Sequence, residues 1–306
     1  MKKIIVLLIV FGLLYNVSCR ETVDAAVTPR QSKTYLVAGI DDVAENTDVL
    51  ILASYNIANS TSTIVHIPRD TLCKYGERYC KINSIFPYER SKGHTRQEAM
   101  SCLTNYISDT FGVLIDGYFC VDSETMIKAV DLIGGVDVEL DRDLPIEDEN
   151  GDVLYTLRAG KNHMDGVSAL RFVRYRRGYA SGDLGRIDAQ KLFISALLKS
   201  ARDDIEIDEM AKICVSVIPQ ITTNIGITEF IGVLFNARLS KGKSIVDDVT
   251  LPGEAMMVDN ASFYIINRKN AADTFERDFS LTNEGFDPRR FLTDESNSAI
   301  ENIYAK

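Results

Sequence analysis

A basic segment stands out in an acidic chain. Residues 158–186 contain seven Lys or Arg and two Asp, so their net charge is +5, whereas the whole chain of 306 residues carries −10. Residues 172–176 alternate apolar or aromatic side chains with basic ones, a period typical of a β-strand. In a strand, Arg174 and Arg176 point to one face, where two guanidinium groups repel each other unless an anion lies between them. Because arginine binds phosphate through paired hydrogen bonds, the pair predicts a phosphate or pyrophosphate site.

The residues that follow extend this polar surface. Arg186 and Gln190 are four residues apart on a predicted helix over 186–201, so they share one helix face. The alternative for the whole segment is an exposed basic strand on a solvated surface, with no ligand.

Acidic side chains stand at the ends of two predicted buried strands. Asp41 follows the strand 34–40, and Asp48 opens the strand 49–55 after a polar turn. Carboxylates beside a phosphate site suit Mg²⁺ or Mn²⁺, which prefer oxygen ligands and often bridge to substrate phosphates. The alternative is local turn and cap chemistry, in which Asp is common. Arg69 and Asp70, just after the strand 63–67 and Pro68, have a similar alternative as a surface ion pair at a rigid turn.

Strands and helices alternate along the chain without a clear linker. This alternation predicts one α/β domain with helices on both faces of a central sheet. Residues 141–152 are expected to form an acidic loop, and the apolar side chains of helices 95–111 and 123–133 to pack in the core. Further strands are expected at 116–121, 136–140, 153–157, 245–251 and 262–267, and further helices at 165–170, 205–216, 227–239 and 268–278.

The N-terminus has the pattern of an export signal. Two lysines precede an apolar run over residues 4–17, which is shorter than the roughly 20 residues that span a bilayer. Cys19 directly after Ser18 predicts a lipoprotein processing site, and an uncleaved signal anchor is the alternative. Residues 20–33 read as a tether and residues 281–306 as a polar tail. We therefore expect an extracytoplasmic protein tethered to the outer face of the cytoplasmic membrane.

An exported protein can form disulfides, and five cysteines follow Cys19. Cys73 and Cys80 flank a predicted hairpin loop and form the first candidate pair; Cys102 and Cys120 form a second. Sequence alone does not fix the pairing, and the odd count leaves one thiol over. No Cys/His pair has a familiar zinc-site spacing.

Several classes of function are disfavoured. The acidic balance argues against general nucleic-acid binding. The chain contains no Walker A, GxGxxG or HExxH motif. Its three histidines show no hydrolase signature with Ser or Cys.

Taken together, the motifs resemble the LytR-CpsA-Psr proteins of bacterial cell envelopes, over about residues 34–267. Their order and spacing both match the family pattern. The matching blocks are 34–41 (TYLVAGID), 46–48 (NTD), 66–71 (HIPRDT), 81–83 (KIN), 130–137 (VDLIGGVD), 157–160 (LRAG), 165–176 (DGVSALRFVRYR) and 182–186 (GDLGR), with Gln190.

The resemblance implies a fold and an activity. The fold is a single α-β-α sandwich over residues 34–280, in which a central mixed sheet lies between helices and an apolar tunnel takes a polyprenyl tail. The activity is metal-dependent transfer of a glycopolymer, of teichoic acid or capsular polysaccharide type, from a polyprenyl-pyrophosphate carrier to peptidoglycan.

The resemblance also implies roles for individual residues. Matched by position, the metal ligands for Mg²⁺ or Mn²⁺ are Asp41 and Asp48, and the pyrophosphate-binding residues are Arg69, Arg174, Arg176 and Arg186, with Gln190 as a polar partner. Independently of the match, the reaction needs a base to take the proton of the acceptor hydroxyl, and the candidates are Asp41, Asp48 and Asp70.

This chain departs from the family pattern in its first acidic turn. The family usually has Arg where Val43 and Asn46 stand, and Ser where His66 stands. Two absent cations weaken the grip on phosphate there, and Arg158, Arg171 or Arg177 are candidates to compensate. The alternatives to transfer are therefore a polyprenyl-pyrophosphate hydrolase and a non-catalytic binder or sensor of lipid-linked precursors. A transcriptional regulator is disfavoured by the export signal and the net acidity.

Overall fold

The computed structural model describes residues 32–42, 44–56, 61–148, 150–175, 179, 183–203, 205, 207–232, 246–258 and 261–279. The chain divides into two units, residues 1–31 and residues 32–306. The predicted signal segment, most of the predicted tether and the predicted tail lie outside the described residues, as do Val43, Arg176 and Arg177.

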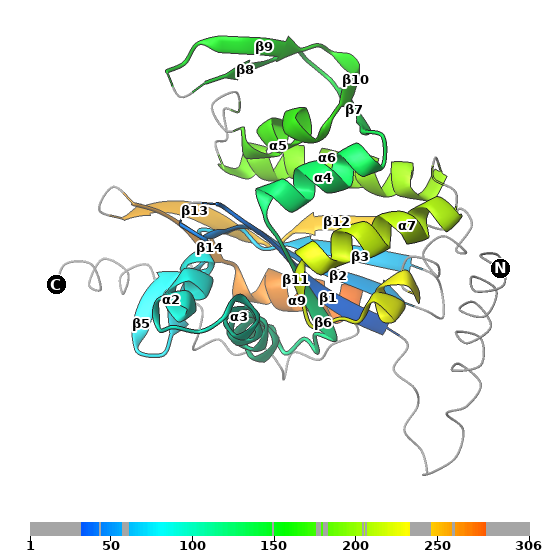
Figure 1. The fold of residues 1–306 in the computed structure, drawn as a ribbon. Coiled ribbons are helices and arrows are strands. Elements are labelled where there is room, and N and C mark those ends of the chain that lie inside the picture. Colours follow the sequence, from blue (N-terminus) through cyan, green and yellow to red (C-terminus); the bar gives the residue numbers. More distant parts are fainter. Residues whose placement is uncertain are drawn as a thin grey trace, which may run out of the picture. The chain divides into compact units, whose positions relative to one another are not determined.

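A six-stranded sheet forms the centre of the second unit (Figure 1). Its strand order is β11-β6-β1-β2-β3-β12. The pairs β1–β2, β2–β3 and β6–β11 are antiparallel, whereas β1–β6 and β3–β12 are parallel, so the sheet is mixed as the family resemblance implies. The strands are β1 Ser32–Ile40, β2 Thr47–Asn56, β3 Thr61–His66, β6 Gly117–Val121, β11 Thr222–Thr223 and β12 Val246–Thr250.

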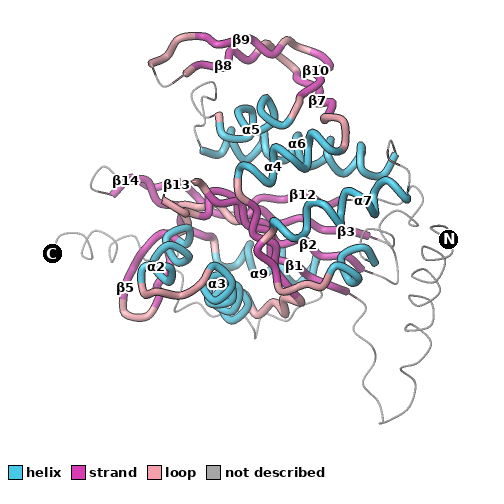
Figure 2. Tube along the Cα trace, viewed as in Figure 1, coloured by secondary structure: helices cyan, strands magenta, loops and turns pink. Residues whose placement is uncertain are grey.

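Helices cover both faces of this sheet, which confirms the predicted α/β layering. Helices α2, α3 and α9 lie on one side, and α4, α5, α6 and α7 lie on the other (Figures 1 and 2). The middle strands are apolar on both faces because both faces are covered. Leu36 and Leu52 pair across β1 and β2, and both are fully buried. The helices are α2 Ile85–Ser91, α3 Arg96–Phe111, α4 Ser123–Leu132, α5 Gly166–Arg174, α6 Asp183–Asp203, α7 Ile207–Val217 and α9 Arg268–Phe279, with 3₁₀ turns η1 Ile82–Ser84 and η2 Ile218–Gln220.

Helix α3 begins and ends as its sequence predicts. Thr95 and Glu98 form a capping box, in which each side chain bonds the backbone N–H of the other. Gly112 ends the helix at φ +64°, a left-handed conformation that favours glycine. The predicted core residues Met100, Leu103 and Ile107 are fully buried. The apolar tunnel remains a prediction.

Four two-stranded antiparallel sheets accompany these layers. They are β4 Leu72–Tyr75 with β5 Arg78–Lys81, β7 Val136–Leu140 with β10 Gly160–Met164, β8 Leu144–Glu147 with β9 Val153–Leu157, and β13 Gly253–Val258 with β14 Ala261–Ile266. The predicted hairpin around Cys73 and Cys80 is therefore present, and the two residues face each other in its register. Their sulfur atoms are 3.8 Å apart and unbonded, so the predicted disulfide is absent; Cys102 and Cys120 are also free thiols.

Two local predictions are wrong. The first is the basic strand over 172–176, because Phe172, Val173 and Arg174 belong to α5. Asp165 caps this helix through the Ser168 N–H, and its buried residues Ala169, Phe172 and Val173 follow the helical period. The second is the acidic loop over 141–152, which contains strand β8.

None of the helices within the described residues combines the length and the apolar character that a membrane crossing requires. Of the predicted helix over 227–239, residues 227–232 are helical and the remainder lies outside the described residues.

Helices α4 and α5 approach each other closely at Gly166. A Cβ atom added there would lie 2.3 Å from the backbone oxygen of Ile127, and the Gly166 N–H donates to Asp131 at 2.7 Å. We predict that Gly166→Ala lowers the free energy of unfolding by about 1–3 kcal/mol, because backbone at that contact must shift. Gly232→Ala is the matched control, since a Cβ there meets nothing within 4 Å. Urea unfolding of both variants tests this, and equal stabilities would contradict it.

Candidate active site

The turn between β1 and β2 carries the first predicted acid. Asp41 directly follows β1, and its carboxylate accepts the N–H groups of Ala44 at 2.6 Å and Asn46 at 2.8 Å. Its own N–H donates to the Asn46 carbonyl at 3.0 Å. Asp41 therefore shapes the turn, which is the local role considered as an alternative. An ionised carboxylate has about four lone-pair sites, so this role leaves it able to bind a ligand as well.

Asp48, near the start of β2, is the first of four side chains whose charges alternate in sign. Arg69 donates to its Oδ1. Beyond that pair, the Arg69 Nε lies 3.9 Å from an Asp70 oxygen, and the Lys81 ammonium lies 3.0 Å from the same oxygen. Arg69 therefore joins Asp48 and Asp70, so the predicted pair of Arg69 and Asp70 does not stand alone at the surface.

Arg174 reaches the acidic turn from the last turn of α5. Its Nη2 donates to the Ser123 hydroxyl at 2.5 Å and lies 3.5 Å from an Asp42 oxygen. The other Asp42 oxygen accepts the Ser123 N–H at 3.4 Å. The Arg174 side chain remains 41% exposed, so a ligand can reach its guanidinium group. Sequence reasoning placed neither Asp42 nor Ser123 in the site, although Asp42 adjoins Asp41 and Ser123 opens a helix.

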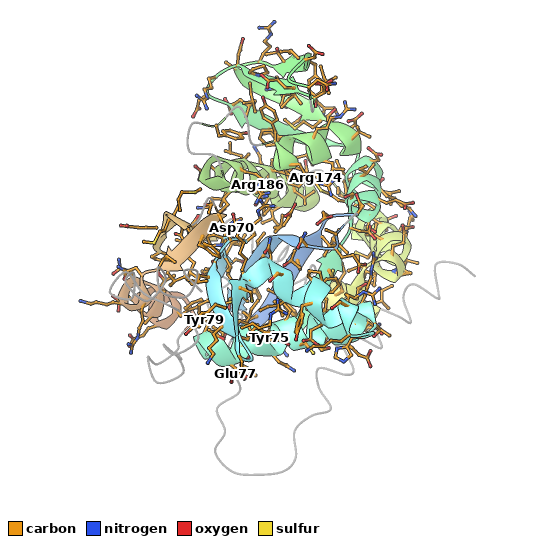
Figure 3. The ribbon with its side chains drawn as sticks, turned by 90° about the vertical axis from the view of Figure 1, so that its left-hand side faces the viewer. Asp70, Tyr75, Glu77, Tyr79, Arg174 and Arg186 are labelled. Atoms are coloured by element: carbon orange, nitrogen blue, oxygen red, sulfur yellow. The ribbon has the colours of Figure 1, made fainter. Side chains whose placement is uncertain are left out.

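Helix α6 brings two more predicted residues. Arg186 is only 2% exposed, and its Nη2 lies 3.4 Å from the Asp48 carbonyl oxygen, to which it donates. Gln190, one turn later and also buried, donates to the Val173 carbonyl at 3.3 Å and so holds the end of α5 that bears Arg174. In the view of Figure 3, Arg174, Arg186 and Asp70 lie in one region, away from the β4–β5 hairpin.

The structure therefore links most of the predicted site residues around one turn. Arg176 lies outside the described residues. Arg158, a candidate to compensate for the missing arginines, instead pairs with Asp143 at 2.7 Å beside the β8–β9 hairpin. Some of the predicted residues lie on this turn, and the others contact it directly or through an adjacent residue. They are Asp41, Asp48, Arg69, Asp70, Arg174, Arg186 and Gln190.

The donor set at this turn fits a small hard cation. Asp41 and Asp48 offer carboxylate oxygens from the adjoining ends of two paired strands. Mg²⁺ and Mn²⁺ are commonly bound by one or two carboxylates, with substrate phosphates and water completing their coordination.

Comparison with known proteins fixes the family. The model of the LytR_cpsA_psr family matches residues 16–280. The chain belongs to this family. The predicted resemblance is thereby confirmed.

Two relatives of the family indicate how far the likeness extends. TagV of Bacillus subtilis, named as a polyisoprenyl-teichoic acid–peptidoglycan teichoic acid transferase, is 31% identical over 208 residues, which are 63% of this chain and 50% of TagV. TagU of Oceanobacillus iheyensis, which bears the corresponding name, is 26% identical over 78% of this chain and 74% of its own length. The chain thus spans about half the length of TagV.

Solved structures show the same fold. The crystal structure of B. subtilis TagV superposes with a TM-score of 0.69 at 23% identity, over 83% of this chain and all of that one. TagT bound to LI-WTA gives a TM-score of 0.64 at 18% identity, over 86% of this chain and 96% of that one. At these identities the likeness concerns the fold alone.

Glu45 holds the acidic turn from outside, between the two positions where family members usually have Arg. Its carboxylate accepts a hydrogen bond from Arg90 at 2.9 Å and another from Arg96 at 2.8 Å. Arg96 also reaches Asp122, the cap of α4, at 3.4 Å. Glu45 adopts φ +54°, a conformation that non-glycine residues seldom take, and its two ion pairs offset that cost. We call these three residues, Glu45, Arg90 and Arg96, the turn clamp.

The charge state of the clamp follows from its surroundings. Burial acts to raise the pKa of the Glu45 carboxyl, but the hydrogen bonds from Arg90 and Arg96 outweigh it, so the pKa lies below its ordinary value. Glu45 is therefore ionised at neutral pH and stabilises the folded state through both arginines. Sequence reasoning missed this clamp, because its partners lie 45 and 51 residues away.

We predict that Glu45→Gln lowers the free energy of unfolding by about 1 kcal/mol at neutral pH, since all three clamp side chains are partly exposed. Because the folded pKa of Glu45 is lowered, the wild-type advantage is present at neutral pH and disappears as pH falls through that pKa. Denaturant unfolding of both proteins across this range measures the difference.

Glu77→Gln serves as the control, because Glu77 is 95% exposed and its ion pair with Lys74 is 3.4 Å long. Its stability should follow wild type at every pH. A gap between Glu45→Gln and wild type that persists unchanged in acid would contradict the role of the clamp.

Proposed function

We propose that this protein is a metal-dependent phosphotransferase that moves a glycopolymer from a polyprenyl-pyrophosphate carrier to peptidoglycan. Its family membership and the names of TagV and TagU support this class of reaction. The observation that carries the proposal is the convergence of Arg69, Arg174 and Arg186 on the turn that bears Asp41 and Asp48. Three guanidinium groups beside two carboxylates form a site for a substrate with several negative charges and a cation.

The arginines divide the work by their exposure. Arg174, which a ligand can reach, would bind the pyrophosphate oxygens. Arg69 and Arg186 are more buried and are fixed by the side chain and the carbonyl of Asp48. Phosphoryl transfer depends mainly on positioning and on neutralising charge, and groups fixed in advance need no rearrangement as charge builds up.

The proposed transfer exchanges one oxygen–phosphorus bond for another. A sugar hydroxyl oxygen of peptidoglycan forms a bond to the glycan-linked phosphorus. The bond from that phosphorus to the bridging oxygen breaks, and polyprenyl phosphate leaves with the electron pair. The hydroxyl proton passes to a carboxylate, for which Asp41, Asp48 and Asp70 are the candidates.

Asp41 and Asp48 would hold Mg²⁺ or Mn²⁺. When bound, such an ion supplies positive charge to the pyrophosphate oxygens. N–H groups of the turn and the Arg69 guanidinium group already hold these two carboxylates in place, which supports the proposal that they receive a cation.

Residues 1–19 would direct export and, through Cys19 or an uncleaved anchor, hold the protein on the outer face of the cytoplasmic membrane. The polyprenyl tail would lie in an apolar tunnel, and the glycopolymer would be of teichoic acid or capsular type.

A transfer assay tests the reaction. The full chain in detergent is mixed with a polyprenyl-pyrophosphate-linked glycan, peptidoglycan oligomers and Mg²⁺, and mass spectrometry detects glycan joined to the oligomer by a phosphodiester. We predict that Arg174→Ala lowers the transfer rate at least 100-fold, the order found for loss of one group that stabilises a transition state. Its combination with Arg176→Ala should abolish transfer, while both variants keep the melting temperature of wild type.

Arg158→Ala is the matched control, because Arg158 is exposed and its partner Asp143 lies outside the site. It should transfer at the wild-type rate. Free phosphorylated glycan as the product would indicate the hydrolase instead, and tight lipid binding without turnover would indicate the sensor. Full activity in the double variant would remove the proposed site.

Metal removal gives a separate prediction. Chelation with EDTA should abolish transfer, and excess Mg²⁺ or Mn²⁺ should restore it. Asp48→Asn should need at least tenfold more metal for half-maximal rate, because the site loses one charged ligand. Asp143→Asn, at the exposed partner of Arg158, should behave like wild type. Undiminished transfer after exhaustive chelation would show that Asp41 and Asp48 serve without a cation.

A further inference from the structure

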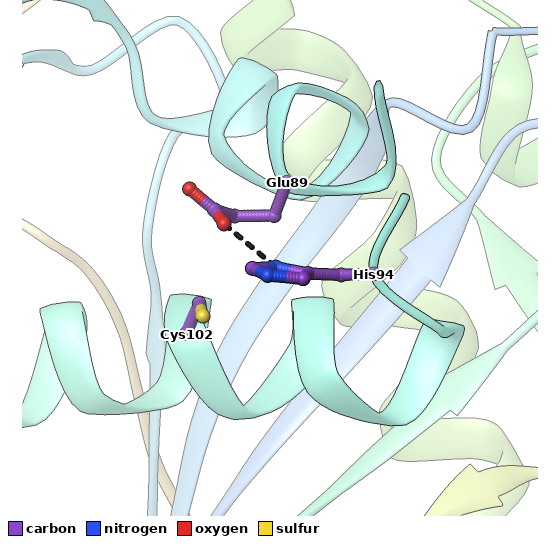
Figure 4. A group of neighbouring side chains, drawn as sticks. All are labelled: Glu89, His94 and Cys102. Carbon is purple, nitrogen blue, oxygen red and sulfur yellow. Dashed lines mark ion pairs between the residues drawn. The ribbon is translucent and has the colours of Figure 1, made fainter. Parts of the chain in front are cut away.

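A second cluster of potential metal ligands lies where α2 meets α3, apart from the acidic turn. It consists of Glu89 in α2, His94 in the connecting turn and Cys102 in α3 (Figure 4). One carboxylate oxygen, one ring nitrogen and the thiol sulfur all lie within 4.8 Å of one another. In tetrahedral zinc sites with ligand bonds of about 2.0–2.3 Å, donor atoms are about 3.3–3.7 Å apart, so small side-chain movements bring these three into range.

The Glu89 carboxylate is already oriented toward the cluster. Its side chain is 3% exposed, and its two oxygens have different partners. Oε1 accepts the Tyr75 hydroxyl at 3.0 Å and the Lys92 ammonium at 2.7 Å. Oε2 lies 2.9 Å from the His94 Nδ1. One oxygen is thus fixed by outer partners while the other faces the imidazole, which is how ligating carboxylates are commonly held.

The His94 ring nitrogen that faces Glu89 is shielded from solvent. Although it lies near Oε2, it forms no hydrogen bond with any group in the described part of the chain. The contact with Oε2 is an ion pair, marked by the dashed line in Figure 4, and a metal ion bound to both atoms would take the place of the proton between them. The turn that places it is well defined, because Gly93 has φ +92° and Arg90 donates to the His94 carbonyl at 2.5 Å.

Cys102 completes a mixed donor set of sulfur, nitrogen and oxygen. Burial raises the pKa of its thiol, so in the metal-free protein it is protonated at neutral pH. Metal binding would displace that proton. The thiolate and the Glu89 carboxylate then neutralise a divalent charge, while His94 binds as neutral imidazole.

We propose that Glu89, His94 and Cys102 form a binding site for a divalent metal ion of the zinc class. Thiolate and imidazole ligands select Zn²⁺ or Co²⁺ over Mg²⁺, which distinguishes this site from the oxygen ligands of Asp41 and Asp48. Part of the His94 side chain is exposed, so the metal can enter, and water can occupy the fourth position. The residues do not follow a familiar zinc spacing, and only the packing of α2 on α3 brings them together.

The site is connected to the turn clamp through one residue. Arg90 donates to the His94 carbonyl with one nitrogen and to Glu45 with another. A metal ion that fixes His94 against Glu89 would therefore also fix the arginine that holds the acidic turn. Its role would be structural, and it would stabilise the folded protein by mass action.

Cobalt binding tests the proposal directly. The full chain, purified in detergent and kept reduced, is titrated with Co²⁺ while the absorption spectrum is recorded. We expect one Co²⁺ per chain with a thiolate-to-cobalt charge-transfer band, and displacement of that band by Zn²⁺. Cys102→Ser should remove the band, and His94→Gln should weaken binding at least tenfold.

Two controls match these variants. His163 lies 2.9 Å from a carboxylate oxygen of Asp137, the same separation as in the cluster, but it is exposed. Cys214 is a buried thiol of another helix. His163→Gln and Cys214→Ser should both keep the band and the affinity.

Thermal unfolding supplies a second measurement. Zn²⁺ should raise the melting temperature of wild type and not that of Cys102→Ser, whose metal-free melting temperature shows whether it folds. Absence of the band in wild type, or a band of equal strength in Cys102→Ser, would overturn the proposal. A cation at Asp41 and Asp48 gives no thiolate band, so failure here is independent of the proposed transferase activity.

Discussion

The ion pair between Arg69 and Asp48, with Arg186 buried behind it, is the interaction on which the rest of the site depends. A buried guanidinium group is costly unless oxygen atoms surround it. Arg186 meets this requirement in part through the Asp48 carbonyl, while the Asp48 side chain binds Arg69. Asp48, near the start of β2, therefore binds two arginines from other parts of the chain. Its backbone carbonyl binds Arg186, and its carboxylate binds Arg69.

This requirement explains why the surrounding packing is tight. Arg186 comes from α6, whose residue Gln190 also holds the end of α5. Helix α5 in turn crosses α4 at Gly166, where only a residue without a side chain fits. Arg174 reaches the Ser123 hydroxyl because these two helices are so close. The position of the partly exposed Arg174 is therefore set by a series of contacts that begins at the buried Arg186.

Sequence reasoning found the elements whose signals are local. The helix predicted over 95–111 corresponds to α3, and the apolar runs gave β1 and β2 within a few residues. It misplaced Arg174 in a strand, because a five-residue alternation also fits the last turns of a helix whose buried face is Ala169, Phe172 and Val173. The arginines and acids were found through motifs, yet their partners could not be, since Ser123 is 51 residues from Arg174.

The clamp at Glu45 lies in the turn where this chain departs from the family pattern. Replacing arginines in a turn with Val43 and Asn46 removes positive charge, and a carboxylate between them adds negative charge. An acidic turn of this kind would repel a pyrophosphate unless nearby cations neutralised its charge. Arg90 and Arg96 do so through their ion pairs with Glu45, while Arg174 lies 3.5 Å from Asp42 and remains partly exposed. The turn therefore depends on α2 and α3, which carry these two arginines, for its shape. If the junction of these helices binds a metal ion, that ion acts on the acidic turn through Arg90, which donates to both the His94 carbonyl and Glu45.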